Sequence, residues 1–115
     1  MDRGIFGENL AVKYLEKKGY KILCRNFRTK FSEIDIIAET NTHLIFVEVK
    51  YRTNKSYGRA EDSISDRKIG KLEAAAKIYI NNFYKGKRKN FQIDAVAINN
   101  FDKLEINHYK NITGG

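Results

Sequence analysis

The chain has 115 residues, with 22 Lys and Arg against 14 Asp and Glu, and a formal net charge of +8. This length fits one domain with one modest hydrophobic core, and so basic a small domain favours a polyanionic partner, most often nucleic acid. A merely solvated basic surface is the alternative. The single cysteine excludes an internal disulfide, no stretch approaches the roughly 18 apolar residues of a membrane helix, and no signal-peptide pattern is present. We therefore expect one cytoplasmic domain over residues 1–115, without a membrane partner.

The first half of the chain predicts one helix and three strands. Apolar residues recur at three-to-four spacing over residues 5–18 and the pattern stops at Gly19, which predicts a helix. Strands are expected over residues 21–28, 33–39 and 44–52, because these runs are rich in apolar and β-branched residues. Polar turns over residues 29–32 and 40–43 separate them, so neighbouring strands should be antiparallel.

The second half predicts a crossover. A polar loop over residues 53–59 leads to a long helix from about residue 62 or 65 to about residue 84, capped by Ser65 or Asp66. A basic loop over residues 85–90, strands over residues 91–98 and 104–109, and a tail that frays from about residue 110 follow. A strand, a helix and a strand in this order give parallel neighbours. The expected fold is α/β, with a mixed sheet flanked by helices in the order α-β-β-β-α-β-β.

The second and third strands carry a set of ionisable residues whose register can be worked out. With the turn centred on Asn41 and Thr42, Asp35 lies opposite Glu48 and Glu33 lies opposite Lys50. All four side chains then share one face of the hairpin, whereas a slip of one residue would move one strand's set to the other face.

Two chemistries fit this face. Like charges directly opposite each other destabilise a strand pair, so Asp35 and Glu48 need a divalent cation, a shared proton or Lys50 beside them. A magnesium site of this kind can polarise a phosphodiester and activate water, and Lys50 could stabilise the developing charge. The alternative is a solvated face with a Glu33–Lys50 salt bridge, and the spacing alone does not decide between the two.

Several motifs resemble those of the UPF0102, or YraN-like, family, whose members are assigned to the restriction-endonuclease-like, PD-(D/E)xK superfamily and are similar to archaeal Holliday-junction resolvases. The resemblance covers about residues 4–98, and its most specific part is the Val-Glu-Val-Lys strand after an Asp-bearing strand. The motifs are Gly7-Glu8, Glu33-Ile34-Asp35, Phe46-Val47-Glu48-Val49-Lys50 and Gln92-Ile93-Asp94.

The resemblance implies a restriction-endonuclease-like core and a role for each matching position. Asp35, Glu48 and Lys50 match the catalytic signature, with Asp35 and Glu48 as ligands of Mg²⁺ or Mn²⁺. Glu8 matches a helix-borne acid that joins the metal site through water, and Glu33 matches a supporting acid. The remaining implied residues are basic ones that would line a phosphate groove, namely Arg52, Arg59 and Lys68.

The sequence departs from the family pattern at three places. Ile34 replaces the proline of the general signature, as is usual in the family, and Ser32 stands where glycine is common. Gln92 stands where arginine is common, which puts one phosphate contact in doubt. Tyr51 and Tyr57 flank the loop after Lys50 and could stack on bases, although packing is the favoured role for each.

These observations support a magnesium-dependent endonuclease acting on DNA rather than RNA, with branched or structured DNA as the candidate substrate. A homodimer would supply the two active sites that a junction requires. The second hypothesis is a non-catalytic nucleic-acid-binding module on the same fold, which the intact carboxylates and Lys50 argue against. The third is a protein-interaction module, for which no motif speaks.

Overall fold

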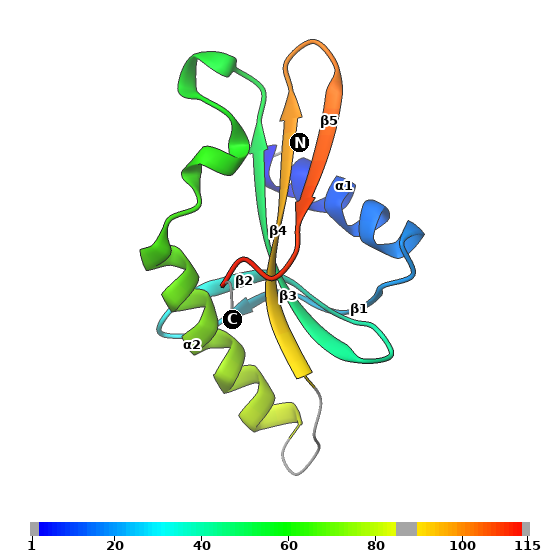
Figure 1. Ribbon diagram of the computed structural model, residues 1–115, viewed down its shortest axis with the longest axis vertical. Helices are drawn as coiled ribbons and strands as arrows, with labels where there is room; N and C mark the ends of the chain where they lie inside the picture. The colour runs from blue at the N-terminus through cyan, green and yellow to red at the C-terminus, as the bar shows by residue number, and fades with distance from the viewer. Residues whose placement is uncertain (1–2, 85–89, 114–115) are drawn as a thin grey trace.

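The computed structural model describes residues 3–84 and 90–113, and within them five strands form one sheet with a long helix on each face (Figure 1). The elements are α1 (Arg3–Lys17), β1 (Lys21–Arg28), β2 (Glu33–Glu39), β3 (His43–Arg52), the 3₁₀ turns η1 (Lys55–Tyr57) and η2 (Ala60–Ser63), α2 (Asp66–Phe83), β4 (Asn90–Asn100) and β5 (Leu104–Tyr109). The predicted α/β class and the order of helix, three strands, helix and two strands are confirmed.

The sheet follows the order of the chain, β1-β2-β3-β4-β5. β3 and β4 are parallel and the other neighbours are antiparallel. The predicted crossover through α2 is therefore confirmed. It carries the chain from the end of β3 back to the start of β4, so that α2 lies across the sheet (Figure 1).

Each helix closes one hydrophobic core against its own face of the sheet. Ala11 and Leu15 of α1 pack on one face, and Leu72 and Tyr79 of α2 pack on the other. This division follows from the alternation of side chains along a strand, since neighbours on β3 such as Ile45 and Phe46 enter different cores. The sheet partners of α1 are Ile36, Ala38, Ile45, Val47, Val96 and Ile98, and those of α2 are Ile34, Ile37, Leu44, Phe46 and Ile93.

The hairpin of β2 and β3 has the predicted register. Four residue pairs, from Ile36 with Val47 to Glu39 with Leu44, form its ladder. This is the alignment that sets Asp35 opposite Glu48. The ladder ends at Ile36 and Val47, just before the acidic residues, so β2 and β3 diverge where the candidate site begins.

The segment between β3 and α2 has more structure than the polar loop predicted there, because it contains both η1 and η2. The helix that follows begins at Asp66, and the hydroxyl of Ser65 accepts a hydrogen bond from the Lys68 N–H, which confirms Ser65 as the N-cap.

Past β5, the N–H groups of Asn111 and Ile112 donate to Asp94 and to the Ile93 carbonyl. The chain is thus held against β4 to at least Ile112. Residues 85–89 of the basic loop and the last two residues of the tail, for which fraying was predicted, lie outside the described residues. Neither described helix combines the length and the apolar character needed to cross a membrane.

Candidate active site

The candidate site lies in the fork where β2 and β3 separate. Beyond the last ladder pair, the N–H of Val49 on β3 donates to Asp35 Oδ2 on β2 at 2.8 Å. A side-chain carboxylate therefore takes the place of a strand carbonyl at the end of the ladder. This bond fixes the Asp35 carboxylate between the diverging strands.

Asp35 and Glu48 form a pair of acids in this fork. The Glu48 side chain is only 3% exposed. Burial raises the pKa of Asp35 to about 8, and the charge of the Glu48 carboxylate and a hydrogen bond with it act in the same direction. The N–H of Val49 opposes this rise by stabilising the ionised form. The pair therefore favours a shared proton or a nearby positive charge.

Two lysines approach the Glu48 carboxylate from different elements. Lys50 Nζ, on the same strand, is 3.5 Å from Glu48 Oε2, and Lys68 Nζ, from the first turns of α2, is 3.6 Å from it. Lys68 also donates to the hydroxyl of Ser32, at 3.2 Å, in the turn before β2. Both lysine side chains are about one third exposed, so either can also face a ligand.

A cavity of about 550 Å³ opens in front of Asp35. Its wall includes Glu8 from α1 and Lys50 from β3, so the structure brings together three of the predicted catalytic residues, while Glu48 lies behind them, out of the lining. The wall consists of Gly4, Ile5, Glu8, Asn26, Arg28, Glu33, Asp35, Val49, Lys50 and Tyr51.

Glu8 is held in place by two residues of β1. Arg25 Nε is 2.8 Å from Glu8 Oε1, and Asn26 Nδ2 donates to the same oxygen at 3.1 Å. The second guanidinium nitrogen of Arg25 bonds the amide oxygen of Asn9, one position further along α1. Glu8 is 8% exposed, so its carboxylate is a fixed part of the cavity wall.

Glu33 does not make the ion pair considered from the sequence. Its carboxylate binds Arg28 Nε of β1 at 3.0 Å, and among the described residues no ion pair joins it to Lys50. The Glu33–Lys50 salt bridge that the alternative of a solvated face required is therefore wrong. Lys50 instead turns to Glu48, and Glu33 stays on the cavity wall.

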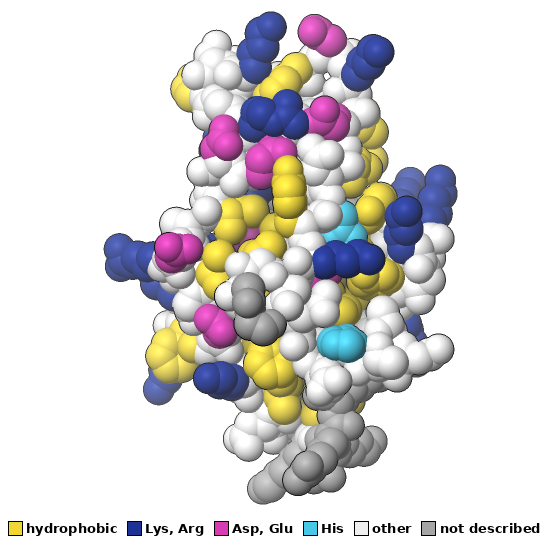
Figure 2. Space-filling view, viewed as in Figure 1, with side chains coloured by type: hydrophobic (Ala, Val, Ile, Leu, Met, Phe, Trp, Pro, Cys, Tyr) yellow, Lys and Arg dark blue, Asp and Glu magenta, His cyan; other side chains and the backbone are white. Residues whose placement is uncertain are grey.

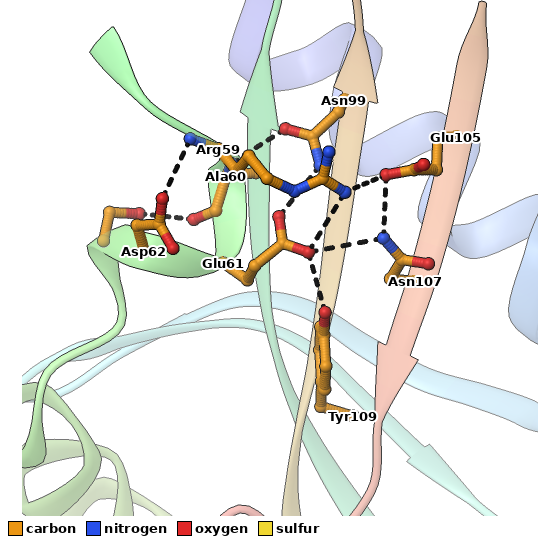
Figure 3. A network of polar contacts seen from close by, with 9 residues as sticks. Arg59, Ala60, Glu61, Asp62, Asn99, Glu105, Asn107 and Tyr109 are labelled. Atoms are coloured by element: carbon orange, nitrogen blue, oxygen red, sulfur yellow. Dashed lines mark hydrogen bonds and ion pairs between the residues drawn. The ribbon is translucent and has the colours of Figure 1, made fainter. Parts of the chain in front are cut away.

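The predicted basic residues divide between two regions. Lys68 reaches the site, and Arg52 lies two residues beyond Lys50 on β3. Arg59 lies elsewhere, in a network with Glu61 and Glu105 that joins η2 to β4 and β5 (Figure 3). Two carboxylates already contact its guanidinium, so Arg59 is not part of the candidate site.

The same network lowers the pKa of a second acid, Glu61, whereas the pKa of Asp35 is raised. Burial favours protonated Glu61, but hydrogen bonds from Tyr109 and Asn99 and the charge of Arg59 outweigh it and lower the pKa of Glu61 to about 2. Asn99 also accepts a hydrogen bond from the N–H of Ala60. These contacts fasten the crossover segment to the sheet (Figure 3).

Sequence reasoning missed the contribution of β1. Arg25, Asn26 and Arg28 contact Glu8 or Glu33 or line the cavity, although nothing in their spacing singled them out. One signal was available, because Asn is among the few residues that tolerate a left-handed backbone, and Asn26 has φ +55°. The bond from Asn26 to Glu8 is a tertiary contact that the sequence pattern does not encode.

The donor set fits a cation that keeps much of its water. Among the described residues, no three His, Cys, Asp or Glu side chains stand close enough together to hold a metal ion. Magnesium ordinarily takes one or two protein carboxylates and completes its shell with water and phosphate oxygens. Asp35 and Glu48 are two carboxylates side by side in the strand fork, while within residues 3–84 and 90–113 a cage built of protein groups alone does not fit.

Comparison with known proteins places the chain in a family. The model of the uncharacterised protein family UPF0102 matches residues 7–98. A UPF0102 protein of Syntrophomonas wolfei is 42% identical over 112 residues and covers 94% of each chain. Another, of Persephonella marina, is 43% identical over 110 residues, covering 95% of this chain and 90% of its own. A third, of Sulfurihydrogenibium sp., is 46% identical over 97 residues, and the match covers 84% of this chain and 83% of the relative. This chain therefore belongs to the uncharacterised protein family UPF0102.

Proposed function

We propose that the protein is a metal-dependent endonuclease that hydrolyses phosphodiester bonds in DNA, with Mg²⁺ or Mn²⁺ as its cofactor. The observation that carries the proposal is the acid pair of Asp35 and Glu48 in the strand fork, with Lys50 beside it and a cavity in front. The resemblance of these residues to the PD-(D/E)xK signature, and of the family to junction resolvases, supports the same activity.

The chain's own groups divide the work as follows. Asp35 and Glu48 would hold the metal ion, and Val49 keeps Asp35 aimed into the fork. When bound there, the ion would polarise the phosphodiester and lower the pKa of a water molecule. Lys50 orients the attacking water and stabilises negative charge that develops on the phosphate. Glu8, on the wall of the same cavity, would join the metal ion through a water molecule.

The net charge of +8 supports a nucleic-acid substrate. On the face seen in Figure 2, Lys and Arg side chains are scattered over the surface and around its outline, with acidic side chains among them at the upper end. At the candidate site itself, the cations at the cavity would bind phosphate. Arg28 and Lys50 line it, and Lys68 lies directly behind.

The proposal is tested by incubating the protein with linear, nicked and four-way-junction DNA in Mg²⁺, Mn²⁺ or EDTA. We expect cleavage that requires the metal and falls by at least about 100-fold in Asp35→Ala and in Lys50→Ala. Asp102→Ala and Lys103→Ala are matched controls, because these residues are exposed in the turn between β4 and β5. They should cleave at the wild-type rate.

The alternative is a binding module in which Lys50 and Lys68 neutralise Glu48 permanently. It predicts no cleavage of any substrate by the wild type, together with DNA binding that survives Asp35→Ala. That combination would replace the endonuclease with the binding module.

A further inference from the structure

We infer that the protein has a nucleotide-binding subsite next to the candidate active site, formed by Arg52 and Tyr57, that takes an unpaired nucleotide of the DNA strand being cut. The subsite is a second cavity of about 460 Å³, beyond the end of β3. Its lining contains no carboxylate and consists of Tyr51, Arg52, Thr53, Asn54 and Tyr57.

Arg52 supplies a cation for this cavity. It is partly buried, and within residues 3–84 and 90–113 no carboxylate or carbonyl oxygen pairs with its guanidinium. Arg25, Arg28 and Arg59, by contrast, each bind an acid. A guanidinium on a cavity wall without an acidic partner is suited to a phosphate group, which it can bind through two parallel hydrogen bonds.

Tyr57 supplies an aromatic face that the protein itself does not cover. The residue is 74% exposed, so the packing role favoured from the sequence is wrong for it. Its backbone is nevertheless well held. Asn54 caps η1 by accepting a hydrogen bond from Ser56 N–H, and Gly58, at φ +85°, ends the turn with a bond to the Lys55 carbonyl. An exposed ring on a fixed turn is the usual platform for a nucleobase.

Tyr51 joins the two cavities, because it lines both of them. Its ring packs against Phe6 of α1 and its hydroxyl accepts a hydrogen bond from Asn100, so this shared wall is held at both its ring and its hydroxyl. Lys50 and Arg52 are two residues apart and point to the same side of β3, which separates them by about 7 Å. That spacing is of the order of one nucleotide step along a strand.

The spacing between Lys50 and Arg52 gives the sequence in which a DNA strand would meet the protein. The scissile phosphate would lie at Lys50, the neighbouring phosphate at Arg52, and the base beyond it on Tyr57. A base can stack on a protein ring only when it is not stacked in a duplex. The inference rests on the proposed function for the identity of the strand, and it specifies the substrate as one with unpaired nucleotides beside the cut.

The test is binding in EDTA, without cleavage, of the full chain to two fluorescent probes. One probe is a blunt DNA duplex, and the other is the same duplex with a short unpaired thymidine flap. We expect the wild type to bind the flap about tenfold more tightly than the blunt duplex. Tyr57→Ala should abolish this preference, and Tyr57→Phe should keep it because the ring remains.

A second pair of variants tests the contribution of the Arg52 charge to binding. Arg52→Gln should weaken binding of the flapped probe more than Lys77→Gln does, since Lys77 is an exposed cation of α2 outside both cavities. Equal binding of both probes by the wild type, or an unchanged preference in Tyr57→Ala, overturns the inference. Loss of the preference in Tyr57→Phe as well overturns it too, because a hydroxyl contact would then explain the binding. Absence of cleavage with the preference intact would remove only the proposed function.

Discussion

Asn26 has an uncommon backbone conformation at a position that touches the candidate site. Its φ of +55° lies in the left-handed region, where residues with a Cβ are disfavoured by about 1–2 kcal/mol and Asn is better tolerated than most. The residue lines the cavity in front of Asp35, and its side-chain amide donates to Glu8 Oε1. The strain and the contact occur together, as at many functional sites.

Two substitutions of Asn26 separate the backbone strain from the hydrogen bond that its side chain donates to Glu8. Asn26→Gly accepts the left-handed backbone but removes the amide, whereas Asn26→Ala removes the amide and retains the strain. We expect the Gly variant to be about 1 kcal/mol more stable than the Ala variant in urea denaturation. Both should lose DNA cleavage to a similar extent, about tenfold, because Glu8 is less firmly held in each. If activity instead follows stability, Asn26 has only a structural role.

Asp35 makes the stability of the folded protein depend on pH in a definite direction. The pKa of Asp35 is about 8 in the folded protein, whereas an unperturbed Asp side chain has a pKa of 3.8. The folded state therefore keeps a proton that the unfolded state releases. The corresponding stability is complete below about pH 4 and is lost as the pH rises through about 8.

Asp35→Asn removes this dependence. Without divalent metal, we compare the free energy of unfolding of the variant with that of the wild type. We expect this difference to move in favour of the variant by on the order of 2 kcal/mol from about pH 5 to about pH 9, after allowance for water in the open cavity. Urea denaturation at the two pH values measures the difference, with Asp102→Asn as the control on an exposed acid. A wild type and an Asp35→Asn variant with parallel pH profiles would show that Asp35 ionises normally.

At the scale of elements, the approach of α1 to β3 places Glu8. Gly7 packs directly on Tyr51, and a Cβ added to Gly7 would lie 2.6 Å from Tyr51 Cβ. Real side chains do not approach so closely, so only glycine lets the helix lie at this depth. The next residue along the helix is Glu8, and its position in the cavity wall depends on the same contact.

The role of this contact is tested by Gly7→Ala, which should lower the free energy of unfolding by about 2 kcal/mol through overpacking and should also lower cleavage by moving Glu8. Gly70→Ala is the matched control. Gly70 lies on the exposed side of α2, and an added Cβ would meet no atom within 4 Å. Alanine there should raise stability by about 0.5–1 kcal/mol without affecting cleavage. Equal effects of the two substitutions would contradict the role of close packing.

At the scale of the whole molecule, local pattern determined the elements well. The bounds of β1, β2 and β5 were predicted to the residue, because apolar and β-branched runs end there at polar turns. The register of the β2–β3 hairpin followed from turn length and alternation. The pairing of Asp35 with Glu48 was therefore predictable, since both residues belong to one hairpin.

Contacts between elements distant in sequence were less predictable. The approach of Lys68 to Glu48 depends on how α2 lies across the sheet, and the clamp of Arg25 on Glu8 depends on how α1 meets β1. Periodicity says which face of an element is buried but not which residue it meets on another element. Arg59 is an example of the same difficulty. Its place in the sequence predicted a phosphate contact, but in the fold it is neutralised by Glu105, which lies 46 residues away.

The bond from the Val49 N–H to Asp35 has one more consequence. A backbone amide that donates to an ionisable side chain changes its electronic environment whenever that side chain gains a proton or a ligand. The nitrogen and proton resonances of Val49 therefore offer an intrinsic spectroscopic reporter of the fork. One peak in an amide correlation spectrum would follow the charge on Asp35 without label or substitution.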